Sequence, residues 1–348
     1  MQRRSLFAIS IALVVCLWSV GGVWSAETRT FVDAAGRKVE VPIAVNRVMA
    51  SGPPASVLLY VLAPDKMAGW VRPLSAEEKA FIAEAYRELP VTGRLTGKES
   101  NADAETVRKI KPDLILDVGT VDAEYATLAD RIQKETGVPY ILLDGSLAKT
   151  AETLHTLGKL LGKEADASVL ADYAENTIGR SEVDPLNPPP VILRLSVYYG
   201  RGKDGLETLG SDSINMEILG ALDFSFIPGG AGGPHKMTAA EIIGWNPDVI
   251  VTLNTGFAET VMKDPAWSHV TAVQNKRVFC SPMLPFGWID SPPGINRLLG
   301  LKWLRAVVYP FNAKGDLREV VRDFYRLFYH VELTDGQAGE LLNGCAIN

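Results

Sequence analysis

Two features of this sequence have residue types and spacing that could serve a chemical function: its glycine-rich motifs and its histidines. The sequence GRGKDG at 200–205 fits the G-x-G-x-x-G pattern of a dinucleotide loop and follows an apolar run. Such a loop needs its third glycine to open a helix, but LETLGSDS comes next, so we interpret 200–205 as a loop at the edge of a cleft. GRLTGKES (93–100) and GKLLGKEA (158–165) resemble phosphate loops, yet both lack one spacer residue and carry Glu where Ser or Thr is required.

The patterns of hydrolases and of metal sites are missing from the sequence. It contains no G-x-S-x-G, H-E-x-x-H or C-x-x-C. His155 and His330 fall in helical patterns and His269 follows a turn, whereas His235 lies between a glycine-rich loop and a helix, where it could face a cleft. No pair of histidines has the close spacing of a zinc site. We therefore expect a binding protein rather than an enzyme, with no cofactor and no resident metal.

Composition and the first residues indicate where the protein works. The chain has 348 residues, 47% of them hydrophobic and 22% charged, which is enough for two domains. Residues 1–25 combine two early arginines, a long apolar run and small residues at its end, which predicts a cleaved signal peptide and a periplasmic protein. Val15 precedes Cys16 where lipoprotein signals usually have Gly, Ala or Ser, so we expect a free protein rather than a lipid anchor at Cys16.

Charge and cysteine content limit the partners. Without residues 1–25 the chain keeps 33 basic and 41 acidic residues, a net charge of −8. An acidic chain without basic runs is a poor candidate for binding nucleic acid.

Two cysteines, Cys280 and Cys345, remain after residues 1–25 are removed. Whether they form a disulfide stays open, because sequence alone does not place them together. We expect a monomer.

Apolar strands alternate with helices in two separate stretches of the chain. Strands such as LILDV and PYILLDG in the first stretch, and KRVFCS in the second, are almost continuously apolar. This is typical of parallel strands buried beneath helices on both faces. Between the stretches, residues 150–182 have helical spacing and no strand pattern, and DPLNPPP (184–190) ends them. The predicted organisation is an α/β N-terminal lobe at 26–149, a helical linker at 150–187, an α/β C-terminal lobe at 188–310 and a C-terminal helix in 311–348.

One unit occurs twice in the sequence. AETVRKIKPDLIL at 104–116 and AAEIIGWNPDVIV at 239–251 place Pro112 and Pro247 135 positions apart. In each unit the proline stops a helix, the acid caps the turn and an aliphatic run enters a sheet. Two lobes built alike imply a cleft between them, and ligands bind in such clefts near the strand ends.

The order and spacing of these segments resemble the class III periplasmic binding proteins of ABC importers, the ferric-siderophore, haem and cobalamin family. The resemblance runs from FVDAAGRKVEVP (31–42) and NRVMASGPPASVLLYVL (46–62), through both Pro-Asp units, to RVFCSPMLPFGWIDSPPGINRLLGLKWL (277–304). It covers nearly the whole mature chain. It implies two Rossmann-like lobes with parallel sheets joined by one long helix, and capture of a metal chelate for delivery to an ABC permease–ATPase complex at the membrane.

The resemblance also implies docking by one acidic residue on each lobe. In the first lobe the matching acid is Glu105, seven residues before Pro112. Seven residues before Pro247 the sequence has Ala240 instead, with Glu241 one step later. Glu241 is therefore carried over as the second permease contact although it departs from the pattern.

Ligand residues vary within this family, so we chose candidates by chemistry. A ferric siderophore is bulky and often anionic, which calls for aromatic walls and guanidinium groups. Side chains of these types, with one histidine, follow predicted strands or lie in loops at the cleft. The predicted ligand-binding residues are Trp70, Arg72, Arg94, Tyr198, Tyr199, Arg201, His235 and Trp288. The segment LPFGWIDSPP (284–293) fits either an aromatic cleft wall or a plug that seals a lobe.

From these features we expect an extracytoplasmic solute-binding protein of an ABC importer that captures an iron chelate, a ferric siderophore. The alternatives are other metal chelates, namely haem, cobalamin or a nickel or cobalt complex. A carrier of bare metal ions would need clustered ligands in the cleft, where the sequence offers His235 at most. A secreted α/β enzyme would need a nucleophile–base pair or a cofactor loop, and the sequence shows neither.

Overall fold

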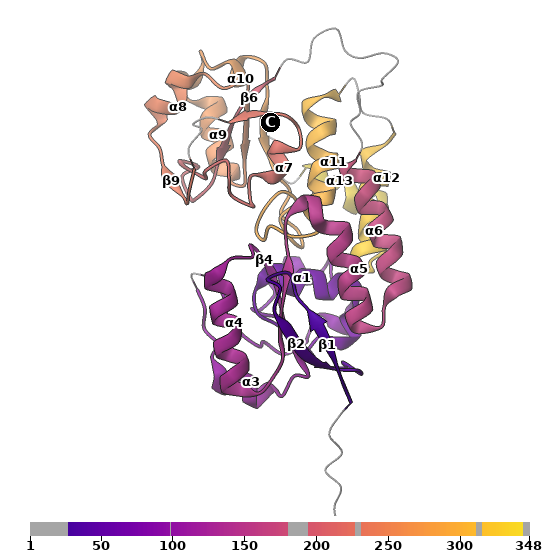
Figure 1. Ribbon diagram of the computed structural model, residues 1–348. Coiled ribbons are helices and arrows are strands. Elements are labelled where there is room, and N and C mark those ends of the chain that lie inside the picture. Colours follow the sequence, from indigo (N-terminus) through magenta and orange to yellow (C-terminus); the bar gives the residue numbers. More distant parts are fainter. Residues whose placement is uncertain (1–26, 98, 180–193, 227–230, 311–314, 344–348) are drawn as a thin grey trace, which may run out of the picture.

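The computed structural model describes residues 27–97, 99–179, 194–226, 231–310 and 315–343. It has two α/β lobes, the N-lobe (residues 27–149) and the C-lobe (residues 194–310), and helices run along one side of both (Figure 1). The predicted signal peptide, Cys16 and Cys345 lie outside the described residues. Among the helices described, none has the length and apolar character needed to span a membrane.

A three-stranded parallel sheet with the order β3-β4-β5 forms the centre of the N-lobe. Alternate residues of its middle strand enter different cores: Leu114 and Leu116 face the main core, and Ile115 faces a smaller one under α3 and α4. Because both faces are covered, the strands read as continuous apolar runs. The elements are β3 (Val48–Ala50), α1 (Pro53–Leu62), α2 (Ala76–Lys79), α3 (Ala104–Ile110), β4 (Leu114–Gly119), α4 (Ala123–Thr136) and β5 (Tyr140–Asp144).

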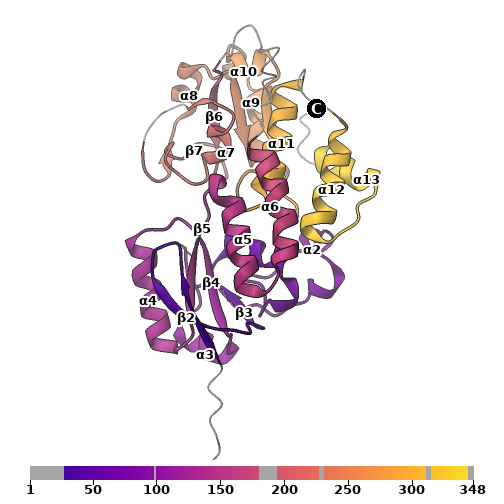
Figure 2. The same ribbon diagram turned by 45° about the vertical axis from the view of Figure 1, so that its right-hand side comes forward.

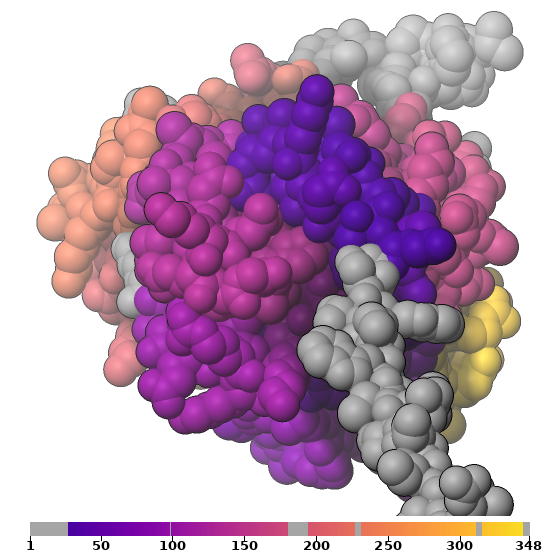
Figure 3. All heavy atoms as spheres, turned by 60° about the horizontal axis from the view of Figure 1, so that its bottom comes forward, coloured from indigo at the N-terminus to yellow at the C-terminus, as the bar shows by residue number. Residues whose placement is uncertain are grey.

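An antiparallel hairpin of β1 (Thr28–Val32) and β2 (Lys38–Pro42) precedes this sheet. It lies on the surface at the outer end of the N-lobe, where Figure 3 shows it in indigo. The Arg29 guanidinium donates to the carbonyls of Lys159 and Leu160 at 2.9 and 2.9 Å. These bonds tie the start of the described chain to the end of a linker helix.

The C-lobe repeats the design with a four-stranded parallel sheet in the order β11-β10-β6-β8. A short antiparallel pair, β7-β9, lies apart from it. The elements are β6 (Ser196–Gly200), β7 (Glu207–Thr208), α7 (Glu217–Gly220), β8 (Ser225–Phe226), β9 (His235–Lys236), α8 (Ala239–Trp245), β10 (Val249–Thr252), α9 (Thr255–Lys263), α10 (Thr271–Gln274) and β11 (Val278–Cys280). The predicted α/β fold with a parallel sheet in each of two lobes is confirmed.

Two helices, α5 (Thr150–Leu161) and α6 (Glu164–Ile178), connect the lobes. They turn at Gly162, whose φ of 68° suits glycine, so that α6 returns past the N-lobe toward the C-lobe (Figure 2). The connector, which the resemblance implied as one long helix, is thus a helical hairpin whose longer member is α6. It packs against α11 (Arg297–Val308), and α12 (Leu317–Tyr329) and α13 (Asp335–Asn343) follow within the predicted C-terminal segment.

The duplicated unit begins and ends its helix in the same way in both lobes. Helices α3 and α8 are each seven residues long, and each starts at a capping box, formed by Asp103 in one and by Thr238 in the other. Each ends at a residue in the left-handed region, Lys111 with φ 52° and Asn246 with φ 51°. The prolines that follow prevent the helices from continuing.

The acid of each Pro-Asp turn has a second role that the sequence did not reveal. The Asp113 carboxylate accepts the backbone N–H of Arg47 at 2.8 Å, just before β3. The Asp248 carboxylate accepts the backbone N–H of Ser196 at 2.8 Å, at the start of β6. In each lobe the acid therefore fixes the start of the central strand against the start of its neighbour.

Candidate ligand-binding cleft

Two adjoining cavities lie between the lobes, beyond the carboxyl ends of β3, β4 and β11. The first, of about 560 Å³, lies between residues 70–78 of the N-lobe and 283–292 of the C-lobe, and we call it the aromatic cavity. The second, of about 810 Å³, lies between the ends of β4 and β5 and residues 212–215, and we call it the acidic cavity. Pro53 and Arg94 line both. A ligand site at strand ends between lobes is the arrangement that parallel α/β folds favour.

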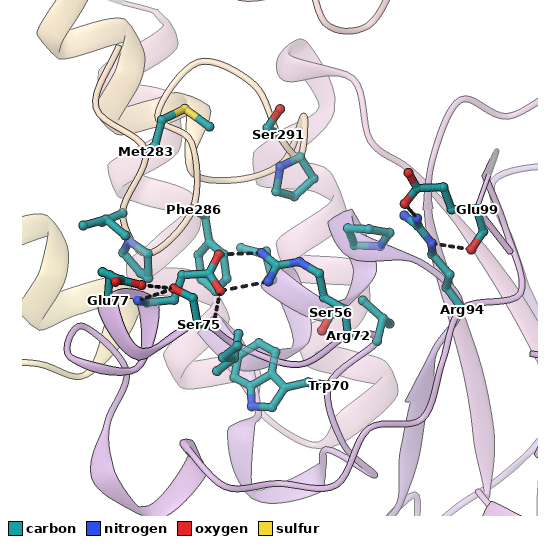
Figure 4. A pocket seen from close by; sticks show the side chains of 18 residues that line it. Ser56, Trp70, Arg72, Ser75, Glu77, Arg94, Glu99, Met283, Phe286 and Ser291 are labelled. Carbon is teal, nitrogen blue, oxygen red and sulfur yellow. Dashed lines mark hydrogen bonds and ion pairs between the residues drawn. The ribbon is translucent and has the colours of Figure 1, made fainter. Parts of the chain in front are cut away.

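Trp70 and Phe286 form the apolar wall of the aromatic cavity, one from each lobe (Figure 4). Their ring centroids lie 6.1 Å apart, and Tyr60 packs beneath both rings at 5.2 and 6.4 Å. The Trp70 Nε1–H donates to the Tyr86 carbonyl at 2.8 Å, which fixes the orientation of the indole. A wall held in this way can cover a ligand at little cost in side-chain entropy.

Three of the predicted ligand residues lie in lobe cores instead of the cleft wall. Trp288 is fully buried, so it acts as a plug. Phe286 of the same proline-rich segment lines the aromatic cavity and acts as its wall. Tyr198 is buried, and its hydroxyl donates to the Gly205 carbonyl at 2.8 Å. The hydroxyl of Tyr199 donates to the Asp290 carboxylate at 3.1 Å. The two tyrosines belong to β6 itself rather than to the loop after it, so their side chains point into the layers that cover the sheet.

Arg72 and Arg94 do line the cavities, and each is joined to a carboxylate of its own lobe (Figure 4). The two Nη groups of Arg72 donate to the Glu78 carboxylate at 2.8 and 2.6 Å. Arg94 donates through Nε to the Glu99 carbonyl at 2.8 Å and through Nη2 to the Glu99 carboxylate. The structure thus brings Trp70, Arg72 and Arg94 together around one cavity.

The ion pair of Arg72 and Glu78 is built into a helix start. The Glu78 carboxylate also accepts the Ser75 backbone N–H at 2.8 Å and completes the capping box of α2. Burial works against ionisation of Glu78, but the hydrogen bonds from Arg72 and Ser75 hold its pKa below the usual value. The contact with Glu78 raises the pKa of Arg72. Both groups are therefore charged at neutral pH.

Arg201 and His235 lie at the C-lobe side and do not line either cavity. The Nε of Arg201 lies 2.9 Å from the buried Asp290 carboxylate, in ion-pair contact but without hydrogen-bond alignment. His235 lies in β9, where it is paired with Thr208 of β7, and its Nε2 is buried without a hydrogen-bond partner among the described residues. The structure does not join these two side chains to the N-lobe set.

The acidic cavity contains carboxylates that the sequence analysis did not single out. Asp117, near the end of β4, is buried and accepts the Tyr140 hydroxyl at 3.0 Å, and burial raises the pKa of Asp117. Asp122 caps α4 through the Tyr125 backbone N–H at 3.0 Å. Asp212 of the C-lobe lines the opposite side. An aspartate just before a helix is interpreted from sequence as a helix cap. The sequence therefore gives no sign that Asp122 also lies at the edge of the cavity.

The turn after β3 is a further part of the site that sequence reasoning missed. A Cβ atom on Gly52 would lie 2.6 Å from the Thr96 hydroxyl oxygen, so a larger residue at this turn would force the Thr96 side chain to move. Pro53 then starts α1 at the first helical position. The hydroxyl of Ser56, one turn into α1, is buried on the wall of the aromatic cavity with no hydrogen-bond partner among the described residues (Figure 4).

A buried arginine joins the lobes beside the cavities. Arg297, at the start of α11, is 1% exposed and donates through Nη1 to the Glu217 carboxylate at 2.9 Å and to the Ile214 carbonyl at 2.9 Å. Its Nη2 crosses to the N-lobe and donates to the Gly145 carbonyl at 2.5 Å. The Glu217 carboxylate also accepts the N-lobe backbone N–H of Leu147 at 2.7 Å. This network, the Arg297 clasp, fixes the separation of the lobes at the base of the cleft.

The two predicted docking acids differ in their surroundings. Glu105 is the second residue of α3, its side chain is 68% exposed, and Lys109 Nζ lies 2.8 Å away. Glu241 is the third residue of α8 and turns back to accept the Thr238 backbone N–H at 2.8 Å. The residue that matches Glu105 in position is Ala240, because the two helices start at equivalent caps. Glu105 is therefore the freer of the two carboxylates.

Across the described ranges, no group of three or more His, Cys, Asp or Glu side chains is placed to hold a metal ion. Cys280 is buried in the C-lobe, with its sulfur 3.6 Å from the Thr255 hydroxyl. The question of a bond to Cys345 stays open because Cys345 lies outside the described residues.

Two lobes with parallel sheets, matching capped helices and a cleft at the strand ends are the architecture of a solute-binding protein. Residues 77–282 match the family model described as "Periplasmic binding protein", and this chain belongs to that family. The recognition of the class III binding proteins from sequence is confirmed. The family consists of transport proteins rather than enzymes, and the chain is the substrate-binding component of an ABC importer.

Individual relatives and structures agree with this assignment. The uncharacterized ABC transporter substrate-binding lipoprotein YvrC of Bacillus subtilis (strain 168) is 26% identical over 266 residues, which are 72% of this chain and 77% of that protein. The high-affinity heme uptake system protein IsdE of Staphylococcus aureus is 22% identical over 238 residues, 63% of this chain and 76% of that one. The structure of an ABC transporter solute binding protein from Sulfurospirillum deleyianum matches with a TM-score of 0.80 at 28% identity, over 91% of this chain and 99% of that chain.

Proposed function

We propose that this protein captures a metal chelate between its lobes, with an iron chelate, a ferric siderophore, as the first candidate, and delivers it to a membrane permease–ATPase complex. The observation that carries the proposal is the pair of adjoining cavities at the strand ends, about 560 and 810 Å³ in volume. Cavities of this size accommodate an organic ligand rather than a single ion. The rigid wall of Trp70 and Phe286 suits the apolar periphery of a chelate.

Haem is the second candidate, because the relatives from Staphylococcus aureus carry the name of a haem uptake protein. Met283 in the aromatic cavity and Tyr125 in the acidic cavity are of the side-chain types that bind haem iron. Cobalamin and a small nickel or cobalt complex are the further candidates. A bare-metal carrier ranks lower because the aromatic cavity is walled mainly by apolar and proline side chains.

In this proposal the chain is first exported and residues 1–25 are removed, and the mature protein then delivers the chelate to the permease. Glu105 on the N-lobe meets a basic residue of the permease, and an acid near the start of α8, Glu241, supplies the second contact. The exposed position of Glu105 supports its part. The bonds of Glu241 to its own helix cap make its contribution the smaller one.

Tryptophan fluorescence of the mature chain tests the proposed cargo. Titration with ferric chelates should quench the emission and saturate at a ratio of one ligand to one protein, because Trp70 lines the cavity. Free Zn²⁺ should have no effect. Saturable quenching by Zn²⁺ but by no chelate would favour a carrier of bare ions and would contradict the proposal.

Trp70→Phe is expected to remove most of the ligand-induced quenching. The affinity, measured by calorimetry, should fall by about threefold or less, since Phe preserves an aromatic surface at this position. The matched control is Trp267→Phe, because Trp267 is buried in the C-lobe core and lines neither cavity. Full quenching in Trp70→Phe would place the ligand away from the aromatic cavity.

A further inference from the structure

In the part of the cleft that the structure describes, carboxylates of the protein itself already neutralise the positive charges. Among the described residues that line the two cavities, the cationic side chains are Arg72 and Arg94, and each faces a carboxylate. Glu78 is also the third residue of the α2 capping box and accepts the Ser75 backbone N–H, which holds its carboxylate in place beside Arg72. An anionic ligand would have to displace a carboxylate that already occupies the guanidinium fork.

Two arginines on the C-lobe side are held in the same way. Arg201 lies against the Asp290 carboxylate at 2.9 Å, and Arg297 donates to the Glu217 carboxylate at the same distance. Asp290 and Arg297 are each 1% exposed, so both pairs belong to the framework of the cleft. Separating a buried pair leaves an uncompensated charge, which makes these guanidinium groups poor partners for a ligand anion.

Acidic side chains outnumber basic ones among the described residues that line the two cavities. Among the described residues, seven carboxyl groups line the cavities: Glu77, Glu78, Glu99, Asp117, Asp122, Glu124 and Asp212. Glu78 and Glu99 are paired with arginines, and burial of Asp117 favours its neutral form. The other four have no ion-pair partner among the described residues and come from both lobes, so the described lining of the cleft carries an excess of negative charge.

The buried hydroxyl of Ser56 shows what kind of polar contact the aromatic cavity offers. Ser56 lines this cavity and is 2% exposed, and its buried Oγ has no hydrogen-bond partner in the described part of the chain. A buried polar group of this kind gains a hydrogen bond when a ligand supplies one. A hydroxyl can donate or accept without carrying charge, so it suits a neutral amide or hydroxamate group.

From these contacts we infer that the cleft selects a chelate with no net negative charge, neutral or cationic, and discriminates against anionic chelates. The inference rests on the proposed function and names the charge class of its cargo. It reverses the expectation from sequence, in which Arg72 and Arg94 were to bind an anionic siderophore. In the structure these arginines are charges that the N-lobe itself compensates.

Titration of the mature full-length chain with three ferric chelates of different charge tests the inference. The probes are a linear trihydroxamate complex with a free ammonium group, which is cationic, a cyclic trihydroxamate complex, which is neutral, and a tricatecholate complex, which is trianionic. The cationic and neutral complexes should bind about tenfold or more tightly than the trianionic one. The preference for the cationic complex should shrink as salt is added. A tricatecholate that binds most tightly would overturn the inference and leave the proposed function standing. Failure of all three to bind would contradict a ferric siderophore as the cargo, which is the first candidate of the proposed function.

Substitutions that free an arginine should change the selectivity. Glu78→Gln keeps the cap of α2, since glutamine also closes a capping box, but leaves the charge of Arg72 uncompensated. It should raise the affinity for the tricatecholate complex by about tenfold and change that for the neutral complex by less than about threefold. The matched control is Glu135→Gln, which frees Arg131 on α4 outside both cavities and should change none of the three affinities. An unchanged affinity for the tricatecholate in Glu78→Gln would show that the pair does not determine selectivity.

Discussion

Glu105→Ala is expected to reduce uptake of the chelate by about tenfold or more, because it removes one of two charged contacts with the permease. The Kd for the chelate should not change, since Glu105 lies at the start of α3 and lines neither cavity. Uptake is measured with radiolabelled iron in cells that carry the importer, and the Kd with the purified variant. The expected signature is thus a loss of transport with intact binding.

Two controls separate docking from other effects of that change. Lys109→Ala breaks the ion pair with Glu105 but leaves the carboxylate in place, so uptake should stay close to that of the unmodified protein. Glu88→Ala removes an acid elsewhere on the N-lobe whose side chain is 77% exposed, against 68% for Glu105, and should also leave uptake unchanged. A rise in Kd in Glu105→Ala would assign Glu105 to the ligand site and would contradict its docking role. Glu241→Gln should reduce uptake less than Glu105→Ala, because the Glu241 carboxylate is bonded to its own helix cap.

Arg297→Ala is expected to lower the free energy of unfolding by about 3 kcal/mol or more, the range for breaking a buried charged network from one side. The substitution leaves the Gly145 and Ile214 carbonyls without their donor and the Glu217 carboxylate without its cation. Because the clasp joins the lobes, the measurement should follow urea unfolding with probes in both lobes. The two lobes should also unfold less cooperatively in the variant.

Arg322→Ala is the matched control for that measurement. Arg322 of α12 pairs with Asp335 at 2.6 Å, but the two side chains are 44% and 75% exposed. An exposed ion pair contributes about 1 kcal/mol at most, so the unfolding midpoint should move little. If Arg297→Ala shifted the midpoint no more than Arg322→Ala does, the Arg297 clasp would not stabilise the lobe arrangement.

Most of the fold was predictable because its signals are local. Parallel strands buried on both faces give apolar runs, and the Pro-Asp units mark where a helix ends and a central strand begins. Helices α3 and α8 begin at matching caps and end at left-handed residues, so the unit that is repeated in the sequence is also repeated in the structure. The direction of α6 was not predictable, since it depends on how the turn at Gly162 packs against the N-lobe.

The candidate site was predictable only in part, for geometric reasons. Trp70, Arg72 and Arg94 lie outside the strands of the N-lobe and do line the cavities, whereas Tyr198 and Tyr199 lie inside β6, one or two residues before its end. A sequence does not locate a strand end to within two residues, and that difference moves a side chain from the cleft to the core. Sequence also does not show how a loop folds, so the carboxylate partners of the arginines were not foreseen.

The segment around residue 288 illustrates the same limit. Phe286 and Trp288 are two positions apart in a proline-rich stretch with no helical or strand period to assign a face. Phe286 lines the aromatic cavity, and Trp288 is fully buried. The sequence allowed either a cleft wall or a plug, and the structure has both: Phe286 forms the wall and Trp288 forms the plug.

Native mass spectrometry of the mature protein, purified without metal or chelator from cells grown with mixed chelates, tests the central claim most directly. The proposal predicts a single adduct whose mass corresponds to one organic ligand plus its metal, lost together when the ligand is displaced. The charge inference further predicts that this chelate is neutral or cationic. An adduct of one bare metal ion, or of an organic molecule without metal, would contradict capture of a metal chelate in the cleft.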